Sequence, residues 1–143
     1  LRENRPEIWE KTYKLLMPMD YLLANSTFKD LPKEVTDYQV NQCLNYYYTM
    51  AQYYGYDLDS FLQAAAGYSS ADDLLDAMSD SITEYAREAL LYQAVAEAMD
   101  IAPTQEQIDT YSAYTETYGA NYCTMVALMD AVSEALTTGA QVK

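Results

Sequence analysis

Apolar residues between positions 75 and 99 recur at alternating steps of three and four, which is the spacing of one face of an α-helix. The face consists of Leu75, Met78, Ile82, Tyr85, Ala89, Tyr92, Ala96 and Met99. This pattern predicts a helix of about 29 residues, or roughly 43 Å. A second apolar row of Leu74, Leu91 and Val95 widens the stripe, so the helix must lie against at least two other elements.

Five further segments have helical spacing. They are residues 7–24 with a kink near Pro18, 32–54, 57–67, 104–119 and 122–136. Only four glycines and four prolines occur in 143 residues, so neither disorder nor a turn-rich β architecture fits. We predict an all-α fold, an elongated domain of about six helices with long antiparallel arm-like hairpins and no strands.

Residue types typical of helix ends flank these segments. The predicted end residues are Asp30, Asp57, Ser70 with Asp73, and Thr104 with Gln107 at helix starts, and Gly55, Gly67 and Gly119 at helix ends. Two of the helices also have a clear apolar face. These faces are Val40, Leu44, Tyr47, Ala51 and Tyr54 in the second helix, and Tyr122, Met125, Val126, Met129, Val132 and Leu136 in the last.

The chain is strongly acidic, and the charge is unevenly distributed. The formal net charge is −14, from 22 Asp and Glu against 8 Lys and Arg. Residues 1–33 hold six bases and five acids, so residues 34–143 carry 17 acids and only two bases. Such a surface repels phosphate backbones and anionic lipid, whereas basic or neutral unfolded chains can approach it. We therefore expect no nucleic-acid and no membrane partner.

The sequence offers no organised catalytic centre, so we expect no enzyme activity, cofactor or metal. Histidine is absent, which removes the commonest general base and metal ligand. Cys43 and Cys123 lie far apart without a CxxC partner and are expected to be buried free thiols. No dinucleotide, P-loop or EF-hand spacing occurs. The acids Asp72, Asp73, Asp76 and Asp80 fit a solvated helix N-terminus better than a cation site.

Sixteen tyrosines against two phenylalanines are the unusual feature of the composition. Tyr46, Tyr47, Tyr48, Tyr53 and Tyr54 crowd onto one predicted helix, where consecutive positions point about 100° apart. If Tyr47 and Tyr54 enter the packed seam, the other three are exposed. Tyrosine combines a large apolar face with a hydroxyl that tolerates water, and seven methionines add adaptable contacts. The alternative is that tyrosine replaces leucine in a loosely packed core.

Four segments carry helix-end and turn motifs in an informative order. Residues 23–32 read LANSTFKDLP, residues 50–62 read MAQYYGYDLDSFL, and residues 90–104 read LLYQAVAEAMDIAPT. Tyr118-Gly119 then precedes the last helix. In this order the segments resemble the C-terminal domain of the trigger factor chaperones. The first resembles the family's helix end with N-S-x-F and a proline, and the second resembles its turn between an arm helix and a short helix. The third resembles a helix end before a capped helix, and the last resembles the closing helix.

The resemblance covers nearly the whole chain and implies one helical chaperone domain over residues 1–143. A body with arm-like hairpins would hold unfolded or nascent polypeptide without ATP. The family's ribosome-binding and peptidyl-prolyl isomerase domains lie outside these residues, so ribosome contact and isomerase activity are not expected here. The implied location is the cytoplasm.

The candidate polypeptide-binding residues come from three predicted helices. They are Tyr46, Tyr47, Met50, Tyr53, Tyr54, Met78, Tyr85, Tyr122, Met125 and Met129. Two alternatives stay open: a helical interaction domain with one dedicated protein partner, and an exported lobe like those of the SurA-like and PrsA-like foldases. The second follows because the chain begins at Leu1 and not at Met, which indicates an excised or processed chain. A homodimer also stays open.

Overall fold

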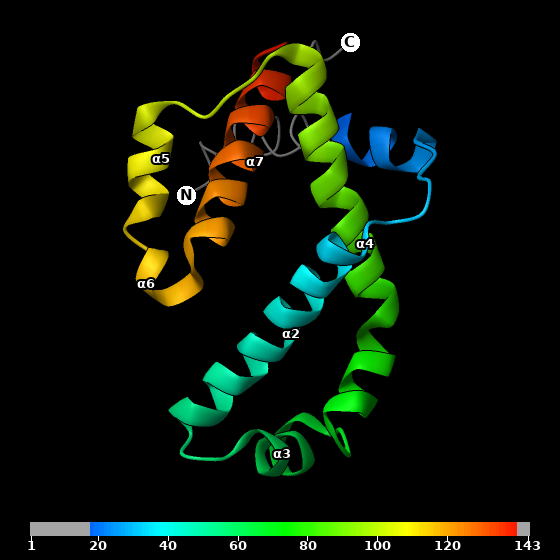
Figure 1. The fold of residues 1–143 in the computed structure, drawn as a ribbon, viewed down its shortest axis with the longest axis vertical. Coiled ribbons are helices and arrows are strands. Elements are labelled where there is room, and N and C mark those ends of the chain that lie inside the picture. The colour runs from blue at the N-terminus through cyan, green and yellow to red at the C-terminus, as the bar shows by residue number, and fades with distance from the viewer. Residues whose placement is uncertain (1–17, 140–143) are drawn as a thin grey trace, which may run out of the picture. The chain divides into compact units, whose positions relative to one another are not determined.

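A computed structural model describes residues 18–139, and every regular element in that range is a helix (Figure 1). The all-α prediction is confirmed. In chain order the elements are a helix over residues 18–25, α2 (Lys33–Tyr53), α3 (Leu58–Phe61), the π-helical turn η1 (Leu62–Ala66), α4 (Ala71–Met99), α5 (Gln105–Ser112), α6 (Thr115–Tyr118) and α7 (Ala120–Gly139). The prediction for residues 7–17, with the kink near Pro18, lies outside the described residues.

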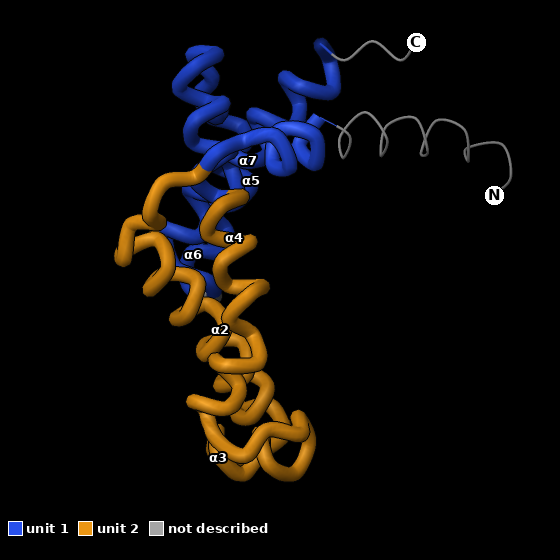
Figure 2. Tube along the Cα trace, turned by 90° about the vertical axis from the view of Figure 1, so that its right-hand side faces the viewer, with its two compact units in different colours: residues 1–27, 89–143 blue, residues 28–88 orange. Residues whose placement is uncertain are grey.

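The chain divides into two compact units (Figure 2). Unit 1 comprises Leu1–Thr27 and Ala89–Lys143, and unit 2 comprises Phe28–Glu88. Helix α4 contributes its first part to unit 2 and its last part to unit 1. Its length of 29 residues is the length that the apolar spacing predicts.

Unit 2 is a helical hairpin in which α2 leads into α3 and η1, and the first part of α4 returns (Figure 1). Its buried side chains are mostly aliphatic and come from every element: Ala51, Phe61, Leu62, Leu74, Ile82 and Ala86. Leu62 and Leu74 are fully buried. At the open end, the Arg87 guanidinium lies 5.8 Å from the centre of the Phe28 ring, within the range of a cation–π contact.

Helix α2 ends in the hydrogen-bond pattern of a Schellman motif. The N–H of Tyr56 donates to the carbonyl of Ala51 at 2.9 Å, and the N–H of Gly55 donates to Gln52 at 3.1 Å. Gly55 adopts a φ of 77°, which a glycine tolerates without a steric penalty. The chain therefore turns sharply after Tyr54, and the aromatic residues before and after the turn come close together.

Asp57 caps α3, as predicted. Its carboxylate accepts hydrogen bonds from the Ser60 N–H at 2.9 Å and the Ser60 hydroxyl at 2.7 Å. These bonds favour the charged form and lower the pKa of Asp57. The predicted cap at Asp30 is wrong, because α2 begins one position after Pro32 and has no side-chain cap. Pro32 itself occupies the N-cap position, and its carbonyl accepts hydrogen bonds from the N–H groups of Val35 and Thr36.

Unit 1 is built on α7, against which α5 and α6 both pack. The buried residues of α7 are Cys123, Ala127, Ala131 and Val132. The predicted face of this helix is therefore only partly right: Val132 is buried, whereas its other five members are half-buried. Small residues at steps of four let the neighbouring helices approach closely, and the larger side chains lie on either side of that line.

Polar contacts join the helices of unit 1. The Gln107 amide donates to Glu134 at 3.2 Å, and the hydroxyls of Tyr92 and Ser133 lie 3.4 Å apart. The predicted capping box of Thr104 with Gln107 is confirmed. The prediction of one helix from there to Gly119 is wrong, because the chain turns at Ala113 and Tyr114 before α6 begins.

Replacing Gly67 by alanine tests the turn after η1. Gly67 has a φ of 80°, and no atom lies within 4 Å of an added Cβ. The substitution is therefore expected to lower the free energy of unfolding through backbone strain alone, by about 1 kcal/mol, measured by urea titration. Gly139→Ala is the control, since Gly139 is helical and equally unobstructed. Equal stability of Gly67→Ala and the unmodified chain would contradict the assigned backbone.

Candidate functional site

The C-terminal half of α2 presents its tyrosines largely to solvent. Tyr53 is 82 % exposed, Tyr46 60 % and Tyr54 58 %, while Tyr47 and Met50 are half-buried. The prediction that Tyr46, Tyr48 and Tyr53 are exposed is confirmed. The prediction that Tyr54 enters the packed seam is wrong, because α2 ends at Tyr53 and the helical spacing no longer fixes where Tyr54 points.

Ring contacts join these tyrosines to the turn of unit 2. The Tyr46 and Tyr47 rings meet edge to face with centroids 5.3 Å apart, and Tyr47 meets Tyr68 in the same way at 6.1 Å. Beyond them, Tyr53 meets Tyr54 at 5.1 Å, and Tyr54 stacks on the buried Phe61 at 6.0 Å. We call these six residues the tip cluster: Tyr46, Tyr47, Tyr53, Tyr54, Phe61 and Tyr68. Phe61 and Tyr68 were not among the predicted site residues, and only the folded turn brings them here.

The tip cluster lies in a part of the chain that is almost free of charge. Residues 38–56 contain no acidic or basic residue, and Asp57 and Asp59 are the only charged residues from there to Ala71. Burial raises the pKa of the Tyr47 phenol, and the neighbouring Tyr68 adds to the effect. Partial burial also raises the pKa of the Cys43 thiol, which is half-buried, so the prediction of two buried thiols is right for Cys123 alone. The rings of the cluster are therefore neutral, and the charged groups beside them are the carboxylates of Asp57, Asp59 and Asp73.

Two other predicted residues of unit 2 lie on α4. Met78 is half-buried, and Tyr85 is 55 % exposed although the spacing of α4 placed it on the buried face. Ala86, the next residue, is fully buried instead. The long stripe of α4 rotates slowly around the helix, because steps of three and four average less than 3.6 residues.

The remaining three predicted residues, Tyr122, Met125 and Met129, belong to unit 1 and are half-buried on α7. Tyr122 continues a series of rings: Tyr118 lies 5.2 Å from Tyr122, and Tyr114 lies 6.4 Å from Tyr118. Tyr114 and Tyr118 are both exposed and were missed as candidates. The steps of four from Tyr114 to Tyr118 and on to Tyr122 are visible in the sequence, but Gly119 places Tyr118 and Tyr122 in different predicted helices.

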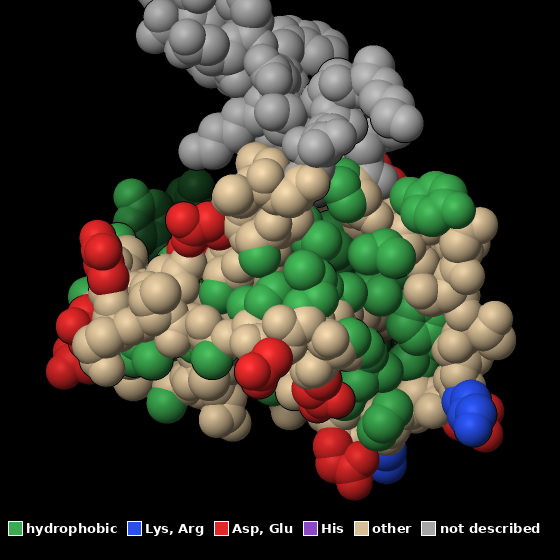
Figure 3. All heavy atoms as spheres, turned by 90° about the horizontal axis from the view of Figure 1, so that it is seen from above, with side chains coloured by type: hydrophobic (Ala, Val, Ile, Leu, Met, Phe, Trp, Pro, Cys, Tyr) green, Lys and Arg blue, Asp and Glu red, His purple; other side chains and the backbone are tan. Residues whose placement is uncertain are grey.

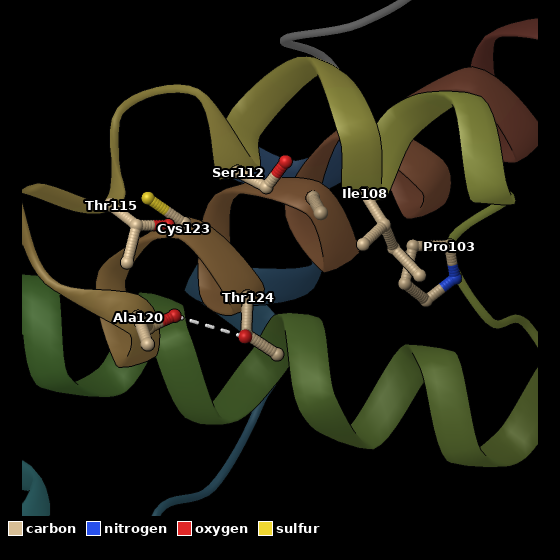
Figure 4. Close-up of a pocket in the computed structure, with 8 residues that line it drawn as sticks. Pro103, Ile108, Ser112, Thr115, Ala120, Cys123 and Thr124 are labelled. Carbon is tan, nitrogen blue, oxygen red and sulfur yellow. Dashed lines mark hydrogen bonds between the residues drawn. The ribbon is translucent and has the colours of Figure 1, made fainter.

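Unit 1 also contains an apolar pocket of about 280 Å³ between α5, α6 and α7. Its lining residues are Pro103, Ile108, Ser112, Thr115, Ala120, Cys123, Thr124 and Ala127. In Figure 4, Ile108 and Pro103 lie at one end, and Thr115, Cys123 and Ala120 lie at the other. A cavity of about 150 Å³ can hold a benzene molecule, so this pocket has room for an apolar side chain.

Acidic side chains outnumber basic ones among the described residues. On the face drawn in Figure 3, acidic side chains are scattered around a hydrophobic area, and basic ones are fewer. Within residues 18–139, no group of three or more Cys, Asp or Glu side chains could hold a metal ion. In the same range, no helix combines the length and the hydropathy needed to cross a membrane.

A comparison with known protein families shows the family to which the chain belongs. The family described as bacterial trigger factor protein C-terminus matches residues 12–137. The chain belongs to this family. No curated protein and no solved structure matches the chain. The trigger factor C-terminal domain is the chaperone-type helical domain and not the prolyl isomerase domain, which agrees with the predicted identity of the chain.

In this trigger factor C-terminal domain, exposed and buried tyrosines should behave differently on substitution. Tyr46→Ser and Tyr53→Ser are expected to change the free energy of unfolding by less than about 0.5 kcal/mol, because both rings are mainly solvated. Tyr92→Ala should cost about 3 kcal/mol, because the Tyr92 ring is buried. Urea titration of the three variants measures this. A large loss at Tyr53 would mean that the ring serves the fold and not a surface.

Proposed function

We propose that this domain is an ATP-independent chaperone module that holds unfolded or nascent polypeptide transiently on the tip cluster. The observation that carries the proposal is an uncharged, tyrosine-rich surface at the turn of unit 2, in a chain that belongs to the trigger factor C-terminal family. The cytoplasm is the location that we propose with it.

The chemistry of the tip cluster suits many different client sequences. Tyr46 and Tyr53 keep much of their rings exposed beside their edge-to-face partners, while their hydroxyls can donate to and accept from a client backbone. Tyrosine has few rotatable bonds, so little side-chain entropy is lost on contact. Met50, half-buried on the same helix, adds a side chain that adapts its shape.

The expected affinity is modest, which a holding function requires. Burial of roughly 300 Å² of apolar surface contributes about 7 kcal/mol at 25 cal/mol per Å². The loss of translational and rotational freedom on association offsets much of this. A client would therefore be released readily, without nucleotide hydrolysis. The acidic charge elsewhere on the chain keeps the chaperone and its complexes in solution.

Suppression of client aggregation tests the proposal. The domain is mixed with two unrelated proteins diluted from denaturant, and light scattering is recorded over time. The unmodified domain should suppress scattering of both, and Tyr46→Ser/Tyr53→Ser should need roughly tenfold more protein for the same effect, because two exposed stacking surfaces are lost.

Tyr21→Ser is the matched control, because Tyr21 is 67 % exposed on a helix of the other unit. The control should suppress aggregation as well as the unmodified domain, and urea titration should show that both variants are folded. Suppression of one client and not the other would favour a dedicated partner. No suppression of either client would contradict the proposal.

A further inference from the structure

One face of α2 carries exposed tyrosines two helical turns apart. Tyr46 and Tyr53 are seven residues apart, which places them only about 20° apart around the helix and roughly 10.5 Å apart along its axis. Thr49 and Met50 lie between them on the same side. We call these four residues the tyrosine face. Both of its rings are among the most exposed large side chains of the described chain.

This spacing matches the repeat of a polyproline II helix. That helix rises about 3.1 Å per residue with three residues per turn, so side chains three positions apart recur every 9.3 Å or so on one side. Prolines at positions i and i+3 of a client would thus meet the Tyr46 and Tyr53 rings in turn. Aromatic-lined surfaces are the usual docking sites of such segments.

The polar groups around the tyrosine face also fit this ligand. A polyproline II segment has no internal hydrogen bonds, and each proline lacks an N–H, so the ligand presents mostly carbonyl acceptors. The exposed amides of Asn45 and Gln52, which precede Tyr46 and Tyr53, can donate to them, as can the hydroxyl of Thr49. None of these groups is charged, which favours an uncharged ligand over a basic or acidic one.

Other peptide conformations fit this face less well. An extended β-strand needs a sheet edge, and within residues 18–139 there is no strand. An amphipathic helix docks through a continuous row of apolar anchors, whereas the exposed polar side chains of Asn45 and Gln52 flank the tyrosine face. A preformed polyproline II segment loses little conformational entropy on docking. Two ring contacts and a few hydrogen bonds are therefore enough for weak binding.

We propose that the tyrosine face of α2 selects proline-rich polyproline II segments of client chains. The inference rests on the proposed function and names the class of client segment that this face prefers. It assigns separate roles to two pairs of residues on α2. Tyr46 and Tyr53 stack on prolines of the client, while the side-chain amides of Asn45 and Gln52 donate to its carbonyls.

Fluorescence anisotropy with two labelled peptides tests this proposal. One is a neutral peptide of about twelve residues with proline at every third position, and the other has alanine in place of each proline. The unmodified chain should bind the proline peptide about tenfold more tightly, since both rings gain a stacking partner. Raising the salt concentration should leave this ratio unchanged, because no charge is involved.

An exchange variant, Gln52→Tyr/Tyr53→Gln, keeps the composition but moves one ring about 100° around the helix. It should stay folded by circular dichroism and lose the preference for the proline peptide. Equal binding of the two peptides by the unmodified chain, or a preference retained by the exchange variant, would overturn the proposal. If the unmodified chain suppresses aggregation while the peptides bind equally, only the polyproline inference fails; if it suppresses nothing, the chaperone function itself fails.

Discussion

Burial of Phe61 and Leu62 at the turn of unit 2 is the interaction on which the exposed surface depends. Both side chains are removed from water, and they follow directly on the Asp57 cap that starts α3. The Schellman motif after α2 closes the same turn from the other side. With the turn fixed in this way, α2 keeps one face for packing, through Val40, Leu44 and Ala51, and its tyrosines point elsewhere. The rings are thus exposed because the buried residues, the Asp57 cap and the Schellman motif fix the turn.

Charge and aromaticity are separated along this chain. All of the acidic excess lies after residue 33, yet residues 38–56 carry no charge at all. A uniformly acidic surface would repel other acidic chains and bind basic ones through long-range attraction. An uncharged aromatic surface instead recognises ligands through short-range stacking and hydrogen bonds, which salt affects little. In the function that we propose, the acids favour solubility, and the contacts of the tip cluster with a client do not depend on them.

The sequence predicts the helices of this fold better than their orientations. The span of α4, the Asp57 cap and the capping box at Thr104 all follow from local chemistry, and each is present. Tyr54 and Tyr85 were misplaced because spacing tells which residues share a face, but not where a helix ends or how its stripe turns. In α7 the buried line is Cys123, Ala127 and Ala131, since close approach of a neighbouring helix favours small residues over large apolar ones. Local signals predict where the helices end on either side of the turn, but they do not predict the contacts that Phe61 and Tyr68 make in the tip cluster.

Site-specific photocrosslinking tests whether unfolded polypeptide binds at the tip cluster. A photoreactive phenylalanine analogue replaces Tyr53 in one variant and Tyr21 in another, both exposed positions. An unfolded client is added, and the crosslinked product is quantified against the same client in its folded state. We expect crosslinking at position 53 with the unfolded client alone, and little at position 21. Equal crosslinking at the two positions, or none at position 53, would rule out the tip cluster as the client-binding surface.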